Sequence, residues 1–157
     1  MAALEPKRLL AVKNVVRYVG GAHIDTNTGK VNGSAFDRTL KDIDGLSFTQ
    51  SGIFAGKQTK DDAQIRLVVG SRLKLGTTAC FAQINVGEAQ CGLTQEFDSE
   101  FFFQEDKLDA EGKWLANPAH ALLMGLPFMG ESVGSLRSEL AGDFLRRKII
   151  RTFPAVG

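Results

Sequence analysis

The chain has 157 residues, which suits one domain and is long enough to bury a sizeable core. Hydrophobic residues make up 43% of it and charged residues 24%, a composition typical of a soluble globular protein. The formal net charge of +1 lacks the large basic excess of many nucleic-acid and membrane-surface proteins, although local basic clusters remain open. We therefore predict a single globular domain over residues 1–157, in which residues 1–10 could form a flexible N-terminal segment.

The first half of the chain contains two predicted strands. Residues 12–19 are rich in β-branched side chains and end at two glycines, which predicts a strand. Glycine, asparagine, aspartate and threonine dominate residues 20–33, which predicts a loop, and ordered structure begins again at residues 34–36. Apolar and polar residues alternate at the start of residues 46–54, which predicts the second strand.

A helix and a third strand follow. The helix is predicted over residues 59–73, where Thr59 and Asp62 have the spacing of a capping box, with aspartate in place of the usual glutamate. Gly76 is placed to end it. Residues 78–86 alternate as a strand does, and residues 87–92 are expected to break that strand with at most one helical turn.

Residues 97–112 combine three adjacent phenylalanines with many acidic side chains. Residues 101–103 are either a strand buried on both faces or an exposed docking surface. We favour the strand, because three exposed phenylalanines would promote aggregation. Residues 106–112 are predicted to be a solvated loop.

Two elements complete the chain. Residues 120–126 form a short apolar run between Pro118 and Pro127, which predicts a buried strand. A second helix is predicted over residues 135–150, and Gly142 within it indicates close packing against the sheet. The result is an α+β domain, in which about five strands form a mixed or antiparallel sheet and two main helices pack on one face.

Two cysteines and two histidines are too few for the usual zinc sites, so we predict no metal and no cofactor. Cys80 and Cys91 are interpreted as reduced thiols, with Cys80 in a core strand; their spacing leaves a disulfide open. Charges scattered through residues 1–17 do not fit a signal peptide, and no stretch approaches the ~18–20 apolar residues of a membrane span. A cytoplasmic protein without a membrane partner is the prediction.

The common phosphate-binding, metallohydrolase and serine-hydrolase motifs are absent, so candidate sites come from local patterns. Arg17, Tyr18 and His23 lie at and after the end of the first predicted strand. An arginine there can hold a phosphate or carboxylate, and a histidine can act as acid or base. The alternative is a surface arginine and a loop histidine that caps a turn.

Two further patterns involve serine, asparagine and the second histidine. A serine nucleophile at Ser34 or Ser47 would need one of the two histidines as its base. His120 follows an Asn-Pro turn, and either faces a cleft or bonds a backbone carbonyl at the strand start. The candidate catalytic residues are His23, His120 and Ser34, and the candidate ligand contacts are Arg17, Tyr18, Ser47 and Asn117.

A basic cluster lies at the end of the second predicted helix and just after it. If the two helices lie side by side on the sheet, this cluster could contact RNA or DNA phosphates. The alternative is a solvated charged face. Its members are Arg137, Arg146, Arg147, Lys148 and Arg151.

Five short motifs occur in an order that resembles a family of small uncharacterised bacterial proteins. They are "RY…H" at Arg17, Tyr18 and His23, "SAF" at residues 34–36, "LS" at 46–47, "GEA" at 87–89 and "NPAHA" at 117–121. The resemblance implies that the spaced polar residues gather at one site.

A second resemblance is to ADP-ribosyltransferases of the Arg–Ser–Glu type, which would imply binding of a nicotinamide dinucleotide. "VVRY" and "SFTQS", followed by Glu88 or Glu100, echo their order, although the strict Ser-Thr-Ser and Glu-x-Glu patterns are missing.

Three function hypotheses follow from different classes. The first is a small accessory or binding domain that acts with a protein, RNA or DNA partner. The second is an enzyme acting on a nucleotide or RNA phosphate, with Arg17 as anion anchor and His23 and His120 as an acid–base pair lining one cleft. The third is a structural subunit of a larger assembly that docks through residues 101–103. The oligomeric state is left open.

Overall fold

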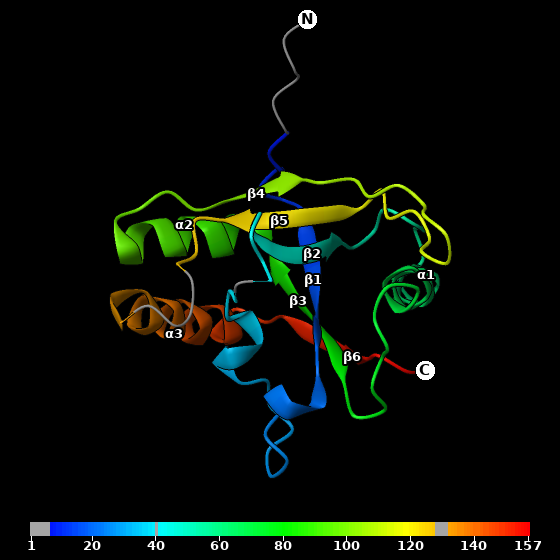
Figure 1. The fold of residues 1–157 in the computed structure, drawn as a ribbon, viewed down its shortest axis with the longest axis horizontal. Helices are drawn as coiled ribbons and strands as arrows, with labels where there is room; N and C mark the ends of the chain where they lie inside the picture. Colours follow the sequence, from blue (N-terminus) through cyan, green and yellow to red (C-terminus); the bar gives the residue numbers. More distant parts are fainter. Residues whose placement is uncertain (1–6, 40, 128–131) are drawn as a thin grey trace, which may run out of the picture.

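Residues 7–39, 41–127 and 132–157 are described by the computed structural model, which is built on an antiparallel sheet (Figure 1). The strand order is β4-β5-β2-β1-β3-β6. In chain order the strands of these ranges are β1 (Asn14–Val19), β2 (Leu46–Gln50), β3 (Cys80–Asn85), β4 (Phe102–Glu105), β5 (His120–Met124) and β6 (Arg151–Pro154). The helices are α1 (Gln58–Gly70), α2 (Val86–Phe97) and α3 (Ser132–Arg147), with short 3₁₀ helices η1 (Gly21–His23) and η2 (Gly33–Phe36).

The predicted α+β class is confirmed, with six strands in the described ranges rather than five. The additional strand is β6, which pairs with β3 at one edge of the sheet. Its sequence does not predict a strand, because it is short and ends in a proline that cannot donate to a ladder.

Each face of the sheet has its own core, because successive residues of β1 point to opposite faces. Val15 and Val19 pack with buried residues of α2, α3 and η2. Val16 packs with Ile65 of α1 and Phe81 of β3. Helices α2 and α3 therefore cover one face and α1 covers the other (Figure 1). The two helices predicted from the sequence, α1 and α3, lie on opposite faces, since both sides of the central strands are apolar.

Strands β1 and β2 are joined by a short ladder. Two residue pairs, Val15 with Gln50 and Val16 with Thr49, connect them, whereas six pairs connect β1 to β3. Beyond Val16 the two strands diverge (Figure 1). We call the opening between residues 17–19 and residues 46–48 the fork. It divides the sheet into a β4-β5-β2 half and a β1-β3-β6 half.

The acidic residues at the start of α1 make tertiary contacts instead of the predicted capping box. The N-cap residue of α1 forms no side-chain cap hydrogen bond. Asp61 accepts hydrogen bonds from three backbone N–H groups in residues 52–55, at 2.8–3.3 Å. Asp62 binds the guanidinium of Arg151 at 2.6 Å. The two carboxylates therefore attach α1 to the preceding loop and to β6.

The sequence does not predict α2, because its two glycines resemble strand breaks. In the structure both allow close packing: a Cβ at Gly87 would lie 2.9 Å from the backbone oxygen of Ala11, and one at Gly92 would collide with the ring of Phe144. The Asn85 side chain accepts a hydrogen bond at 2.9 Å from the N–H three residues later, so a recognisable N-cap does begin the helix.

Helix α3 packs through small residues. Ala141 and Leu145 are fully buried, whereas Leu140 is half exposed. Gly142 packs against Gly33 of η2 rather than against the sheet, and a Cβ at Gly142 would overlap the Gly33 carbonyl oxygen. Helix α3 therefore holds η2 in place through backbone contact.

Two of the three phenylalanines, Phe101 and Phe103, belong to the core, whereas Phe102 faces the other way and is covered by the guanidinium of Arg8. Phe101 and Phe103 are buried and Phe102 is half-buried. Residues 7–10 of the predicted flexible segment pack along β4, where the N–H of Leu9 donates to the carbonyl of Phe103 at 3.0 Å. Residues 1–6 of that segment lie outside the described residues.

Both cysteines are free thiols, which agrees with one of the two alternatives left by the sequence. Cys80 is half-buried in β3, and this burial raises the pKa of its thiol. Within the described ranges, no helix combines the length and apolar character needed to cross a membrane.

Candidate functional site

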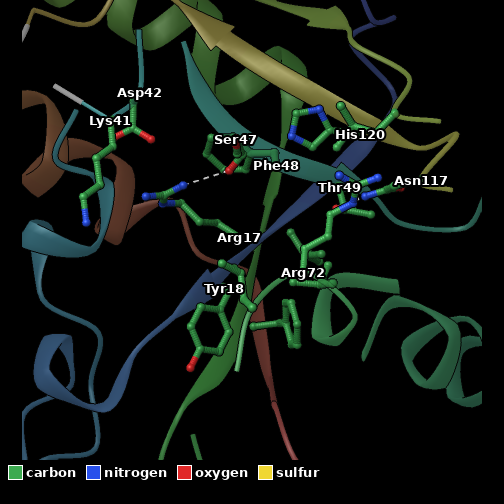
Figure 2. Close-up of a pocket in the computed structure, with 15 residues that line it drawn as sticks. Arg17, Tyr18, Lys41, Asp42, Ser47, Phe48, Thr49, Arg72, Asn117 and His120 are labelled. Atoms are coloured by element: carbon green, nitrogen blue, oxygen red, sulfur yellow. Dashed lines mark hydrogen bonds between the residues drawn. The ribbon is translucent and has the colours of Figure 1, made fainter. Parts of the chain in front are cut away.

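A cavity of about 410 Å³ lies at the fork and is lined from both faces of the sheet, by Val69 and Phe81 on the α1 face and by Arg17 and Phe48 on the other (Figure 2). Val16, Tyr18 and Phe81 of the sheet form its apolar wall with Val69 and Leu73, which come from the end of α1 and the turn after it. The size is that of small-ligand sites. Charged and polar side chains stand at its two ends: Arg17, Lys41 and Asp42 at one, and Thr49, Arg72, Asn117 and His120 at the other.

Arg17 lies in the fork, where two backbone carbonyls hold its guanidinium. Its Nε donates to the oxygen of Ala35 at 2.7 Å, and its Nη1 donates to the oxygen of Ser47 at 2.9 Å. Among the described residues, no carboxylate forms an ion pair with it. Burial lowers the pKa of Arg17 to about 10, while Asp42 and Asp37 oppose that shift, so the group stays charged at neutral pH.

The position of Arg17 follows from the divergence of the two strands. The N–H of Gln50 donates to Ala119 on the β5 side, and alternation along β2 therefore turns the carbonyl of Ser47 toward β1. No ladder pair forms at that point, and the Arg17 side chain takes the place of the missing strand partner. The sequence correctly selects Arg17 and Ser47, but Ser47 contributes its carbonyl to Arg17 and only lines the cavity with its side chain.

The charged side chains that line the cavity are mostly cationic. Arg17, Lys41 and Arg72 line it against the single carboxylate of Asp42. This local excess of positive charge contrasts with the near-neutral chain as a whole. An anionic ligand group is the natural complement of such a lining.

Arg72 is held by the loop between β4 and β5. Its Nη2 donates to the carbonyls of Asp109 at 2.9 Å and Leu115 at 3.1 Å, and its guanidinium carbon lies 5.2 Å from the centre of the Trp114 ring. The Nε of Arg72 is buried and has no hydrogen-bond acceptor among the described residues. Arg72 is thus a second guanidinium that carbonyl groups position, and no carboxylate of the described ranges forms an ion pair with it.

His120 is fixed through one ring nitrogen. Its Nδ1 lies 2.9 Å from the backbone oxygen of Asp106 and 3.0 Å from the Oδ2 of the same residue. Both neighbours are acceptors, so Nδ1 carries a proton and Nε2 is the nitrogen left for a ligand. Of the two alternatives for His120, the structure shows both together: the residue bonds a backbone carbonyl and also lines the cavity.

Asn117 and Tyr18 form part of the cavity wall, and their polar groups are already hydrogen-bonded within the protein. The Nδ2 of Asn117 donates to the Oγ1 of Thr49 at 3.1 Å, and its Oδ1 accepts from the N–H of Ala119 at 3.1 Å. The hydroxyl of Tyr18 accepts from the N–H of Gly76 at 3.0 Å. Both side chains line the cavity with their internal hydrogen bonds already made.

His23 and Ser34 form a separate pair. The Nδ1 of His23 lies 2.8 Å from the Oγ of Ser34, and neither residue lines the cavity. The predicted acid–base pairing of His23 with His120 is therefore not found, because each histidine has a different partner. The cause is the chain after β1, which folds into η1 and η2 and packs against α3, away from α1.

The predicted basic surface does not form. Helix α1 lies on the opposite face of the sheet from α3, and four of the five members of the cluster pair with three carboxylates. Its contacts are Arg146 and Arg147 with Asp143, Lys148 with Glu88, Arg151 with Asp62, and Arg137 with the carbonyl of Phe97.

Sequence reasoning missed Asp106 as a site residue and placed it in a solvated loop. A signal was present, because Asp106 lies three residues after the predicted strand at residues 101–103 and His120 begins the next predicted strand. Consecutive strands commonly pair as a hairpin, which brings the end of the first beside the start of the second. Arg72 was not selected for the site, since its role depends on where α1 ends relative to the sheet.

A second cavity, of about 320 Å³, lies near the start of α1 and is polar. Two of its three charged lining groups already have partners: Asp61 accepts three backbone hydrogen bonds, and Arg151 binds Gln83 and Asp62. In the described part of the chain, no three His, Cys, Asp or Glu side chains are grouped to hold a metal ion.

Comparisons with models of protein families, with curated proteins and with solved structures found no match. The two resemblances drawn from short motifs therefore stay predictions. For the ADP-ribosyltransferase pattern, neither glutamate lines the cavity: Glu88 pairs with Lys148 at 3.7 Å, and Glu100 pairs with Arg8 at 2.7 Å.

Proposed function

We propose that this protein is a small-ligand-binding domain whose cavity takes an anionic group attached to an apolar body. Arg17 is the observation that carries the proposal. Two backbone carbonyls aim its guanidinium, and its Nη2 donates to no group of the described residues. A guanidinium has five N–H donors, so donors remain for a carboxylate or phosphate.

A comparison with Arg151 supports a binding role for Arg17. Arg151 is also partly buried, but its guanidinium bonds both oxygens of Asp62, as a structural ion pair does. The hydrogen bonds of Arg17 go only to carbonyl oxygens, and Asp42 and Asp37 act on its charge from beyond ion-pair distance, so burial still disfavours the charged form. A bound anion would relieve that cost, so the fold should gain stability from the ligand.

The apolar wall favours a ligand with a ring or a short hydrocarbon body over a bare anion. Tyr18 and Phe81 meet edge to face with ring centres 5.7 Å apart, and together with Val16 and Val69 they present a firm surface beside the cationic end. Inorganic phosphate would use the arginines alone. An aryl phosphate or aryl carboxylate would use both surfaces.

Isothermal titration calorimetry tests the proposal with four probes: p-nitrophenyl phosphate, benzoate, inorganic phosphate and neutral p-nitrophenol. We expect the aryl anions to bind most tightly. Arg17→Gln should raise the dissociation constant of p-nitrophenyl phosphate by at least about tenfold, the effect expected from losing one charged hydrogen bond. Lys41→Gln should raise that constant by about two- to fivefold, since Lys41 is exposed.

Lys30→Gln is the matched control, because Lys30 is exposed, has the same charge and does not line the cavity. It should bind as the parent protein does. Lys41→Gln keeps the test valid if Arg17→Gln does not fold. Absence of binding by every probe, or binding that Arg17→Gln and Lys41→Gln leave unchanged, would overturn the proposal.

An accessory role with a protein, RNA or DNA partner and a cytoplasmic location stay predictions from the sequence. The basic cluster, most of which pairs with carboxylates, gives no support to nucleic-acid binding at α3. A ligand-binding accessory domain remains compatible with a protein partner.

A further inference from the structure

We propose that the same cavity hydrolyses a phosphate monoester, with His120 as the general base and Asp106 as the residue that positions it. The proposal rests on the anion-binding function above and adds a reaction to it. It arises from the end of the cavity opposite Arg17, where His120 and Arg72 stand (Figure 2).

The hydrogen bonds of His120 prepare it for proton transfer. Asp106 supplies two acceptors to Nδ1, a backbone oxygen at 2.9 Å and a carboxylate oxygen at 3.0 Å. They fix the ring and the tautomer, so the lone pair of the neutral ring is on Nε2. The carboxylate also stabilises the imidazolium that forms when Nε2 takes a proton. The His120 side chain is 12% exposed, so bulk water has little access to it.

Arg72 adds a positive group beside this dyad. Carbonyl oxygens and the Trp114 ring hold it, and its Nε has no acceptor among the described residues. The loop that anchors Arg72 is the same loop that begins with Asp106. One segment therefore positions both the general base and a charge able to stabilise a developing oxyanion.

The charge of the lining favours a phosphate over a carboxylic ester. Three cationic side chains face one carboxylate, and a phosphate monoester carries up to two negative charges where a carboxylic ester carries none. Arg17 and Arg72 provide the planar donor pairs that phosphate oxygens accept. The organic group would lie on the apolar wall of Tyr18 and Phe81.

In the proposed reaction, Nε2 of His120 removes a proton from a water molecule as the water oxygen forms a bond to phosphorus. The bond between phosphorus and the ester oxygen breaks on the side opposite the attacking water, and the leaving oxygen departs as an oxyanion that takes a proton from solvent water, while Nε2 releases its own proton to solvent. One water and one monoester give one alcohol and one phosphate, and His120 ends in its starting state. The proton on Nδ1 stays with Asp106 throughout.

The experiment follows release of p-nitrophenol from p-nitrophenyl phosphate, together with binding of the same compound by calorimetry. His120→Gln should lower turnover by about 10²–10⁴-fold and change the dissociation constant little. Asp106→Asn should lower kcat and shift the acidic limb of its pH profile, which a purely structural role would not do. Glu96→Gln, on the exposed side of α2, is the control and should keep full activity.

The outcomes separate this proposal from the binding function. Binding without turnover, or turnover that survives in His120→Gln, would overturn the catalytic proposal and leave the binding domain intact. Hydrolysis of p-nitrophenyl acetate in place of the phosphate would overturn the substrate class. Absence of binding would overturn both proposals together. Circular dichroism of each variant confirms that loss of activity is not loss of fold.

Discussion

Replacing Gly142 with alanine sets helix propensity against packing, and the structure indicates that packing dominates. Alanine favours a helix interior by about 1 kcal/mol over glycine. At this position, however, the new Cβ would overlap the carbonyl oxygen of Gly33. The new Cβ is fixed to the backbone of α3 and the oxygen belongs to the backbone of η2, so neither atom can rotate away. Helix α3 must therefore separate from η2. Overpacking of this kind costs about 3 kcal/mol at the upper end of its usual range.

The net expectation for Gly142→Ala is a loss of about 2 kcal/mol, because the propensity gain offsets part of the clash. For a domain of this size, that loss corresponds to a Tm lower by about 4–8 °C. Gly70→Ala, at the last residue of α1, is the control, since its Cβ would meet only the flexible end of Leu75. Differential scanning calorimetry measures both. A Tm of Gly142→Ala equal to or above the parent value would refute the reasoning.

Three further predictions concern charge and reactivity. Asp62→Asn removes the carboxylate bound to Arg151, whose side chain is 24% exposed. It should lower the free energy of unfolding, measured with urea, by about 3 kcal/mol, and a loss below about 1 kcal/mol would show that the pair behaves as a surface ion pair. Burial raises the pKa of Asp37, so the folded protein holds this proton more tightly than the unfolded chain, and the ionised form destabilises the fold above that pKa. Asp37→Asn should therefore raise the urea midpoint at neutral pH, and the gain should shrink as the pH falls toward about 4; a pH-independent gain would contradict this. Iodoacetamide should alkylate the exposed Cys91 before Cys80, whose pKa is raised; equal labelling rates in mass spectrometry would show that β3 opens readily.

The sequence predicts those elements whose pattern is local. The β-branched residues of β1, the alternation in β2 and β3 and the apolar run of β5 identify these strands, and apolar residues at helical spacing identify α1. Helix α2 is missed because Gly87 and Gly92 weaken its pattern, although they are needed where Ala11 and Phe144 approach. Such close approaches are tertiary facts that a single sequence does not display.

The residues of the candidate site were likewise predicted only in part from the sequence. Arg17, Tyr18, Ser47, Asn117 and His120 are selected by their places at strand ends and turns, and all five line one cavity. Grouping them with His23 and Ser34 fails, because the direction in which the chain leaves β1 depends on packing between η2 and α3. Arg72 can be assigned to the site only when the end of α1 is known, whereas Asp106 could have been found from the expected pairing of the two strands on either side of it.

The short ladder between β1 and β2 also bears on where the sheet opens most readily. Only two residue pairs join the half-sheets, against six between β1 and β3, so we expect backbone hydrogen bonds to open more readily at Val16 and Thr49 than within either half-sheet. The cavity spans the β1–β2 junction, with Arg17 and Phe81 on the β1-β3-β6 half and Ser47 and His120 on the β4-β5-β2 half. A ligand that contacts both half-sheets would stabilise the junction between them, and amide hydrogen exchange should then slow in both half-sheets at once.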